Sequence, residues 1–133
     1  FAKEVDFFSI GTNDLTQYTM SVDRGNDKVS YLYSPLNPAV LRSIRHIIAC
    51  GREAGIMVGM CGEAASDPMM IPLLLAFGLN EFSMSASAIL RARKMVTEYS
   101  VQELQAVADK AMSFATTAEV EQYMKEFVES GTV

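Results

Sequence analysis

Two short apolar segments that each end in polar residues constrain the fold of this chain more than any other feature. The first, Asp6–Gly11, is followed by the tripeptide Thr12–Asp14, and the second, Ile56–Met60, is followed by Cys61–Glu63. Helical sequence follows each of them. In parallel α/β folds, ligands bind beyond the carboxyl ends of the strands. The pattern therefore predicts two strands that deliver reactive side chains to one site.

Helix signals fill the chain between and around these two strands. Asp14 is predicted to cap a helix from Leu15 to about Ser21, with Gln17 in the capping-box position. The dipeptide Asn37-Pro38 combines an N-cap with a proline at the first helical position, so it predicts the start of the strongest helix. Gly55 is predicted to end that helix.

The second half of the chain predicts one more strand and then only helices. The strand is Glu81–Met84, and the helix before it is expected to begin at Asp67-Pro68 and to end at Gly78. The helix starts predicted after it are Ser85 or Ser87, the capping box Ser100–Glu103 and the capping box Thr116–Glu119. The first of these helices is expected to carry Ile89, Leu90 and Val96. The last is expected to carry, on one face, Val120, Tyr123, Met124, Phe127 and Val128.

Three strands that alternate with helices predict an α/β fold with a parallel sheet. The chain of 133 residues suits one domain, 1–133, whereas a closed (β/α)8 TIM barrel needs eight strands and roughly 250 residues. We therefore expect either a small open sheet or the C-terminal portion of a (β/α)8 barrel with an all-helical tail. The segment Phe1–Glu4 contains no initiating Met, which favours the second interpretation.

Composition argues against several classes of function. The net charge is −5, and no stripe of Lys and Arg is present, which argues against a nucleic-acid surface. The longest strongly apolar stretch, Leu73–Phe77, is far too short to cross a bilayer, and no signal-peptide pattern is found. The two cysteines, Cys50 and Cys61, do not form a secreted disulfide framework. We therefore expect a protein of the reducing cytoplasm.

Asn13 and Asp14 are the first candidate site residues. At the end of a strand and the start of a helix, an amide can donate to a phosphate oxygen, and a carboxylate can hold Mg²⁺, which prefers hard oxygen ligands. Asn and Asp also build turns and helix caps, so the residues alone leave a structural role open.

Cys61 and Arg24 are the other candidates. Cys61 lies where an apolar strand gives way to a turn, and a thiol there suits either a nucleophile or a proton donor. Arg24 lies in the loop Val22–Asp27, and its planar guanidinium suits phosphate or carboxylate, although a loop arginine is often only a solvated charge. Cys50 is interpreted as a small core residue, and His46, with no ligand partner expected at a suitable spacing, as an ordinary helix residue.

The segments Phe8–Gln17 and Gly59–Glu63 together resemble the phosphoenolpyruvate-utilising enzymes. This family includes Enzyme I of the bacterial sugar phosphotransferase system, pyruvate phosphate dikinase and phosphoenolpyruvate synthase. The segments Val22–Asp27, Leu32–Pro38 and Glu81–Ser85 are most similar to the Enzyme I branch. The resemblance covers essentially the whole chain.

The resemblance implies a (β/α)8 barrel that binds phosphoenolpyruvate and Mg²⁺ at its strand ends and forms homodimers. It implies that Asn13 and Arg24 bind the substrate phosphate and that Asp14 binds Mg²⁺. It also implies that Cys61 donates the proton that converts the enolate to pyruvate. In Enzyme I the phosphoryl group passes to an enzyme histidine and then to a histidine-containing phosphocarrier protein.

Several parts of such an enzyme are absent from the sequence. The resemblance places the other Mg²⁺ carboxylate and further arginines on earlier barrel strands, and the phosphorylated histidine on a separate domain. The only histidine, His46, lies in a different context, so the chain by itself is not expected to transfer phosphate. An open barrel segment is expected to self-associate. The alternatives are a fragment of a dikinase or synthase, and a non-catalytic barrel module that binds a partner.

Overall fold

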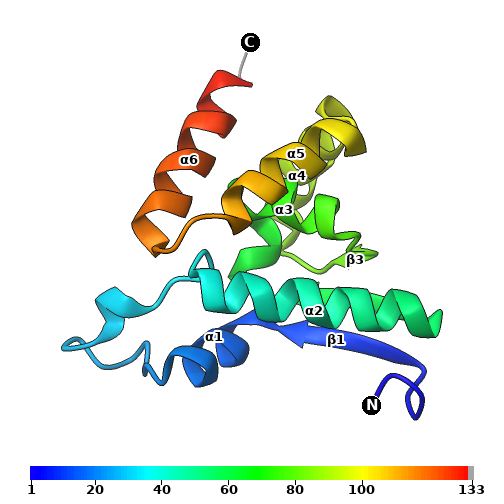
Figure 1. Cartoon of the computed structure of the whole chain (residues 1–133), viewed down its shortest axis with the longest axis horizontal. Helices are drawn as coiled ribbons and strands as arrows, with labels where there is room; N and C mark the ends of the chain where they lie inside the picture. The colour runs from blue at the N-terminus through cyan, green and yellow to red at the C-terminus, as the bar shows by residue number, and fades with distance from the viewer. Residues whose placement is uncertain (132–133) are drawn as a thin grey trace.

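The computed structural model describes residues 1–131, so the last two residues of the predicted domain lie outside the described residues. The elements alternate in the order that the sequence predicts (Figure 1). They are β1 (Phe7–Gly11), α1 (Thr12–Met20), the 3-10 turn η1 (Ser30–Leu32), α2 (Pro38–Ala54), β2 (Met57–Cys61), the 3-10 turn η2 (Glu63–Ser66), α3 (Met70–Phe77), β3 (Glu81–Phe82), α4 (Ala86–Glu98), α5 (Val101–Met112) and α6 (Thr117–Ser130).

The three strands form one parallel sheet in the order β1-β2-β3. Phe8 pairs with Val58, Gly11 pairs with Cys61, and the short strand β3 pairs with the middle of β2. This topology, followed by the helices α4, α5 and α6, confirms the α/β prediction and fits part of a (β/α)8 barrel with a helical tail.

Helices cover only one face of this sheet. Helix α2 lies close to Phe8 and Val58, because a Cβ atom at Gly51 of α2 would collide with the Val58 side chain. Side chains alternate between the two faces of a strand, and on the opposite face Phe7 is 58% exposed and Met57 is 47% exposed. Parallel sheets are normally covered on both faces, so within residues 1–131 this sheet has an uncovered face on which Phe7 and Met57 are exposed.

Helix α1 begins earlier than the sequence predicts. Its first residue is Thr12, its N-cap is Gly11, and no side chain caps it. The predicted N-cap Asp14 is therefore wrong: Asp14 lies within the first turn, where its carboxylate faces the positive end of the helix dipole. Gln17 likewise makes no capping box, and its side chain accepts a hydrogen bond from the Arg24 N–H.

Helix α2 follows its prediction closely. The Asn37 side chain accepts a hydrogen bond from the Ala39 N–H at 2.9 Å, Pro38 takes the first helical position, and Gly55 ends the helix at a φ of 71°. The Asn37 side-chain amide also donates to the Thr117 hydroxyl at 3.0 Å. One cap residue therefore joins the start of α2 to the start of α6.

Helices α3 and α4 differ from their predictions. The Asp67 side chain accepts from the Met69 N–H, but α3 begins only at Met70. Ser85 precedes α4 without capping it through its side chain. The predicted helix with Ile89, Leu90 and Val96 is present as α4, but these three residues are exposed, and its buried residues are Ala92 and Met95.

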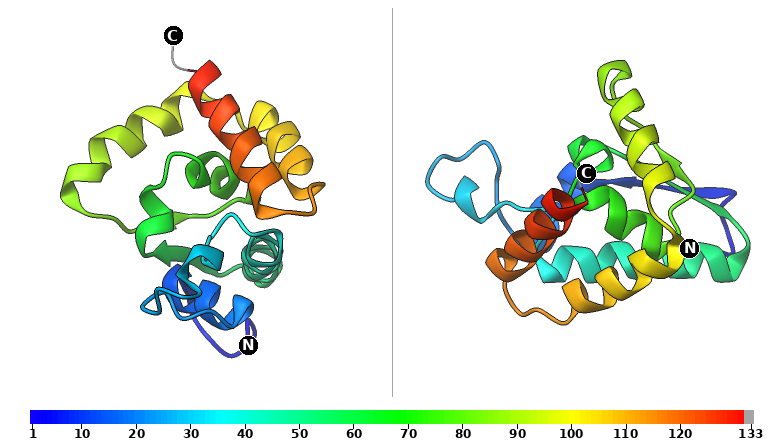
Figure 2. Two further views of the ribbon diagram at one scale, coloured as in Figure 1. Left: turned by 90° about the vertical axis from the view of Figure 1, so that its left-hand side faces the viewer. Right: turned by 90° about the horizontal axis from the view of Figure 1, so that it is seen from above.

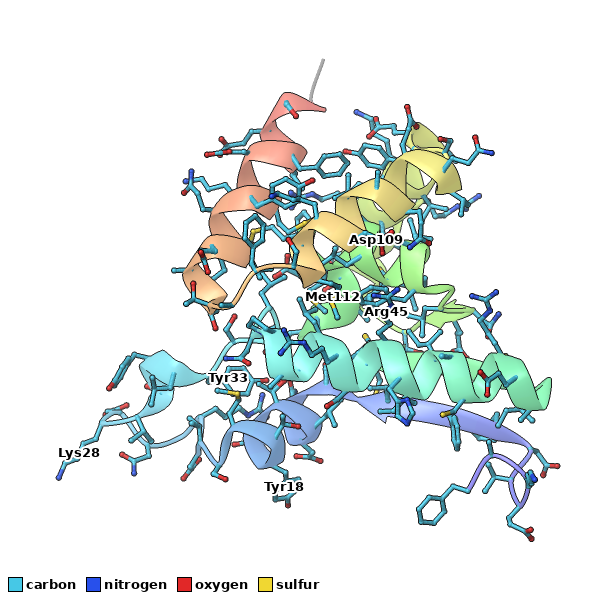
Figure 3. All side chains as sticks on the ribbon, in the orientation of Figure 1. Tyr18, Lys28, Tyr33, Arg45, Asp109 and Met112 are labelled. Carbon is cyan, nitrogen blue, oxygen red and sulfur yellow. The ribbon has the colours of Figure 1, made fainter. Side chains whose placement is uncertain are left out.

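Helices α5 and α6 carry both predicted capping boxes, at Ser100–Glu103 and Thr116–Glu119. Helix α5 packs on α3, and Arg45 of α2 forms an ion pair with Asp109 of α5 at 3.6 Å (Figure 3). The predicted face of α6 is confirmed by Val120 and Met124, which are fully buried.

The elements are arranged in layers around α2. In Figure 1, β1 and α1 lie on one side of α2, and the later helices lie on the other. Figure 2 shows that α4 diverges from α5 and α6 at its N-terminal end and that the loop between α1 and α2 projects from the body. Within residues 1–131, no helix has the combination of length and apolar character that crossing a membrane requires.

Candidate active site at the ends of β1 and β2

The carboxyl ends of β1 and β2 lie next to each other in the sheet. Their last residues, Gly11 and Cys61, are register partners. The polar segments Thr12–Asp14 and Cys61–Glu63 therefore leave the sheet at one edge, as the sequence predicts. The two motifs belong to a single site.

A buried threonine connects the two strand ends. The Thr12 side chain is 1% exposed, and its Oγ1 donates a hydrogen bond to the carbonyl oxygen of Cys61 at 3.0 Å. The next residue, Gly62, has a φ of 98°, and a Cβ atom there would lie 2.5 Å from the same Oγ1. Any other residue at Gly62 would clash with Thr12, so glycine permits this close approach.

Cys61 ends β2 as an exposed, free thiol. Its backbone carbonyl is held by Thr12, so the residue that carries the thiol is fixed relative to the start of α1. An accessible thiol at a fixed position is able to react with a ligand bound at this edge.

Asn13 and Asp14 occupy the first turn of α1. Asn13 is half-buried, and its Oδ1 accepts a hydrogen bond from the Tyr33 hydroxyl at 3.1 Å. Asp14 is exposed. The first turn of a helix presents free N–H groups and the positive end of the helix dipole, so it favours an anionic ligand beside the Asn13 amide.

Arg24 reaches the same edge from the projecting loop. Its backbone N–H donates to the Gln17 side chain at 3.1 Å, and its Nη1 lies 3.9 Å from Oε2 of Glu63. Both members of this ion pair are largely exposed, so the pair adds little stability. The ion pair shows that Arg24 lies beside the turn that follows Cys61.

All four predicted site residues therefore converge on one edge, but sequence reasoning missed their partners. Thr12 and Glu63 lie inside the two strand-end motifs, Thr12–Asp14 and Cys61–Glu63, so the motifs themselves could have indicated that they belong to the site. Tyr33 lies in the segment Leu32–Pro38, where nothing local indicates a contact with Asn13, 20 residues away.

The residues at this edge fit a magnesium ion that takes only part of its coordination from this chain. Residues 1–131 contain no group of three or more His, Cys, Asp or Glu side chains that could enclose a metal. Mg²⁺ does not need such a cage, because it keeps waters and substrate phosphates and uses one or two carboxylates. Asp14 is an exposed carboxylate at this edge and would be the residue to hold such an ion.

A second cluster lies away from this edge, on α2. Cys50 Sγ is 3.6 Å from Nε2 of His46, one helical turn away, so the expectation that His46 has no cysteine at a ligand spacing is wrong. Both residues line a hollow of about 650 Å³ along β1 and α2, which is otherwise mostly apolar. Two ligands do not make a metal site, and the hollow follows the open edge of β1.

The chain is similar to known proteins over most of its length. Residues 1–101 match the family model described as PEP-utilising enzyme, PEP-binding domain. The chain is 56% identical over 126 residues to the phosphoenolpyruvate-protein phosphotransferase of Bacillus subtilis, covering 95% of this chain and 22% of that protein. It is 50% identical over 130 residues to the protein of that name from Staphylococcus carnosus, covering 98% of this chain and 23% of that protein. The chain thus spans about a fifth of the length of these relatives.

Proposed function

The chain belongs to the phosphoenolpyruvate-utilising enzymes, and from this we propose that it forms part of a phosphoenolpyruvate-protein phosphotransferase, Enzyme I. In this proposal, residues 1–133 are the C-terminal portion of a (β/α)8 barrel that binds phosphoenolpyruvate. The alternative of a dikinase or synthase has less support, because the relatives at 50–56% identity carry the phosphotransferase name.

One observation carries the proposal. The pairing of Gly11 with Cys61 places an amide, a carboxylate and a thiol at the same edge of the sheet, and Arg24 lies beside the turn that follows the thiol. A substrate with a phosphate at one end and a carbon that must gain a proton at the other requires this combination of groups.

The proposed chemistry divides the reaction between these groups. The Asn13 amide and the Arg24 guanidinium bind the phosphate oxygens and balance their charge. When the phosphoryl group leaves the enol oxygen for a histidine nitrogen outside this chain, pyruvate remains as its enolate. The Cys61 thiol donates its proton to the terminal carbon of that enolate, which forms pyruvate and leaves a thiolate to be reprotonated from solvent.

Asp14 is proposed to hold Mg²⁺ together with a carboxylate from outside this chain. The bound ion would supply positive charge next to the phosphate and carboxylate oxygens of the substrate. The histidine that takes the phosphoryl group also lies outside the chain in this proposal, because His46 is on α2 beside Cys50 and not at the strand ends. The next acceptor is a histidine-containing phosphocarrier protein.

We also propose a cytoplasmic location and a homodimer. Both cysteines are free thiols, which is typical of reducing compartments. In the proposed barrel, the uncovered sheet face with Phe7 and Met57 is the interior face that the remaining strands cover, so the homodimer is proposed from the family alone.

A hybrid enzyme tests the proposed function. This chain replaces the matching segment of the Bacillus subtilis relative, and phosphorylation of the phosphocarrier protein and release of pyruvate are measured. We expect the hybrid to turn over and Arg24→Ala to raise the KM for phosphoenolpyruvate strongly. Arg91→Ala is the matched control, since Arg91 is an exposed arginine on α4. A folded hybrid without turnover, beside an active parent, would contradict the proposal.

A further inference from the structure

The Asn13 side chain can present either of two opposite chemical groups to a ligand. Its carboxamide carries an NH₂ donor on one side and a carbonyl acceptor on the other. A phosphate accepts hydrogen bonds, so only the NH₂ side attracts it, while the carbonyl oxygen repels it. The usefulness of Asn13 therefore depends on which way its amide is turned.

Tyr33 makes the hydrogen bond that one of these orientations requires. Its hydroxyl donates to Asn13 Oδ1 at 3.1 Å. The Asn13 NH₂ group donates to no acceptor among residues 1–131, so it is left for a ligand. If the amide were turned over, the NH₂ group would donate to the tyrosine oxygen and the carbonyl oxygen would face the ligand. Tyr33 can therefore donate to the carbonyl oxygen in the one orientation in which the NH₂ group is left for a phosphate.

The segment that carries Tyr33 is anchored independently of α1. The Tyr33 N–H donates to the Ser30 carbonyl at 3.0 Å. The neighbouring Ser34 hydroxyl donates to a carboxylate oxygen of Glu121 on α6 at 2.8 Å, and Leu36 is buried in the core. Figure 3 shows Tyr33 where the projecting loop returns to the body, close to α1. Tyr33 therefore reaches Asn13 from a fixed support.

The carbonyl side of Asn13 is close to the turn after Cys61. A Cβ atom built on Gly62 would lie 3.6 Å from Asn13 Oδ1 and 3.7 Å from its Cγ, which is ordinary contact distance. Because residue 62 is glycine, that space is left open, and the Tyr33 hydroxyl is the side-chain group that bonds to the Asn13 carbonyl.

We propose that Tyr33 is a positioning residue that holds the Asn13 carbonyl so that the Asn13 NH₂ group faces the substrate phosphate. The role of the phosphate rests on the proposed function, whereas the orientation of the amide does not. Tyr33 acts through Asn13 and makes no contact with the substrate in this proposal.

The first experiment observes the amide directly. The full chain is labelled with ¹⁵N at asparagine, and the side-chain NH₂ signals of Asn13 are assigned by comparison with Asn13→Asp. We expect Tyr33→Phe to shift these signals without ligand. Tyr31→Phe is the matched control, because Tyr31 lies two residues away and is 79% exposed. Unmoved Asn13 signals in Tyr33→Phe would overturn the proposal.

The second experiment measures what the orientation does for the substrate, in the hybrid enzyme. Loss of one neutral hydrogen bond predicts that Tyr33→Phe raises the KM for phosphoenolpyruvate about threefold to tenfold, with little change in kcat. In an Asn13→Ala background, the same substitution should have no further effect. If Tyr33→Phe raised the KM by the same factor with and without Asn13→Ala, Tyr33 would act by a route other than Asn13, and the proposal would be overturned.

The two experiments separate this inference from the proposed function. If the Asn13 signals respond to Tyr33→Phe but the hybrid does not use phosphoenolpyruvate, the action of Tyr33 on Asn13 stands and the proposed function fails. If the hybrid is active and the Asn13 signals do not respond, the proposed function stands and the role of Tyr33 fails.

Discussion

The position of Cys61, and not the presence of a thiol alone, sets it apart from the other cysteine of the chain. The chain has a second cysteine, Cys50, which lies beside His46 on α2. Cys61 ends β2, and Thr12 fixes its backbone next to the start of α1. At the residue scale, the difference between a spare thiol and a proton donor is therefore one of position.

Replacement of Cys61 by alanine in the hybrid enzyme should abolish proton donation without disturbing substrate binding. We expect pyruvate formation to fall by about 10²-fold or more, which is the usual contribution of a positioned acid. The affinity for phosphoenolpyruvate should remain nearly unchanged. A coupled pyruvate assay and a binding titration measure the two quantities. Cys50→Ala should have little effect, and near-normal turnover of Cys61→Ala would remove Cys61 from the mechanism.

Asp14 is not the N-cap of α1, because Gly11 takes that position, and its structural role is limited to that of a carboxylate in the first turn. Asp14→Asn should therefore cost only about 0.3–1 kcal/mol of stability, the value of a carboxylate in the first turn of a helix. We expect the variant hybrid to need a much higher Mg²⁺ concentration for half-maximal activity. Activity measured over a Mg²⁺ series tests this, with the exposed loop residue Asp27→Asn as the control. An unchanged Mg²⁺ requirement would rule out Asp14 as a ligand.

At the scale of elements, α5 and α6 begin with the same device. In each, a hydroxyl side chain bonds the N–H of the glutamate three residues later, and that glutamate bonds back to the cap. The pKa of Glu103 is lowered mainly by the hydrogen bond from the Ser100 side chain and, to a smaller extent, by the one from the Ser100 backbone N–H. The pKa of Glu119 is lowered in the same way by Thr116. Hydrogen bonds to a carboxylate stabilise its charged form.

These lowered pKa values predict an acid-dependent loss of stability. At a pH above its ordinary pKa of 4.5, each carboxylate contributes its full stabilisation to the fold. That contribution is lost as the pH falls through the lowered pKa of the folded state. The urea midpoint of Glu103→Gln/Glu119→Gln should therefore fall less between pH 6 and about pH 3 than that of the unaltered chain. Glu53→Gln, an exposed residue of α2, is the control. Parallel pH profiles for all three proteins would contradict the prediction.

At the scale of the whole molecule, the sheet formed by the described residues, 1–131, is covered on one side and open at both edges. Phe7 and Met57 are register partners on the uncovered face, and both are substantially exposed. Hollows lined mostly by apolar residues follow β1 and the region of β3 and α4. Open strand edges and exposed apolar surface favour association with another polypeptide segment or with a second copy of the chain.

We therefore expect the 133-residue chain to self-associate in isolation. Light scattering over a dilution series should show species larger than a monomer at high micromolar concentration. Phe7→Lys/Met57→Lys should shift the equilibrium towards the monomer, because it places charge on the uncovered face. Val101→Lys, at an exposed position on α5, should not. A well-folded monomer of the unaltered chain at that concentration would contradict the expectation.

Features set by neighbours in the sequence were predictable from the sequence alone. The cap at Asn37-Pro38, the end of α2 at Gly55 and the two capping boxes follow from hydrogen bonds and backbone preferences within a few residues. The strand-end motifs were predictable for the same reason. Since parallel strands end at one edge, the motifs also predicted that Asn13, Asp14 and Cys61 would lie together.

Only the tertiary structure decided the features that depend on distant residues. The buried side of α4 is set by its packing on α3, so Ala92 and Met95 are buried while Ile89 and Leu90 stay exposed. Helix α1 begins at Thr12, where the buried Thr12 side chain bonds Cys61, 49 residues away. The contacts of Tyr33 with Asn13 and of Glu63 with Arg24 likewise join separate segments. No local pattern encodes such pairs, because their geometry exists only once the sheet has brought the segments together.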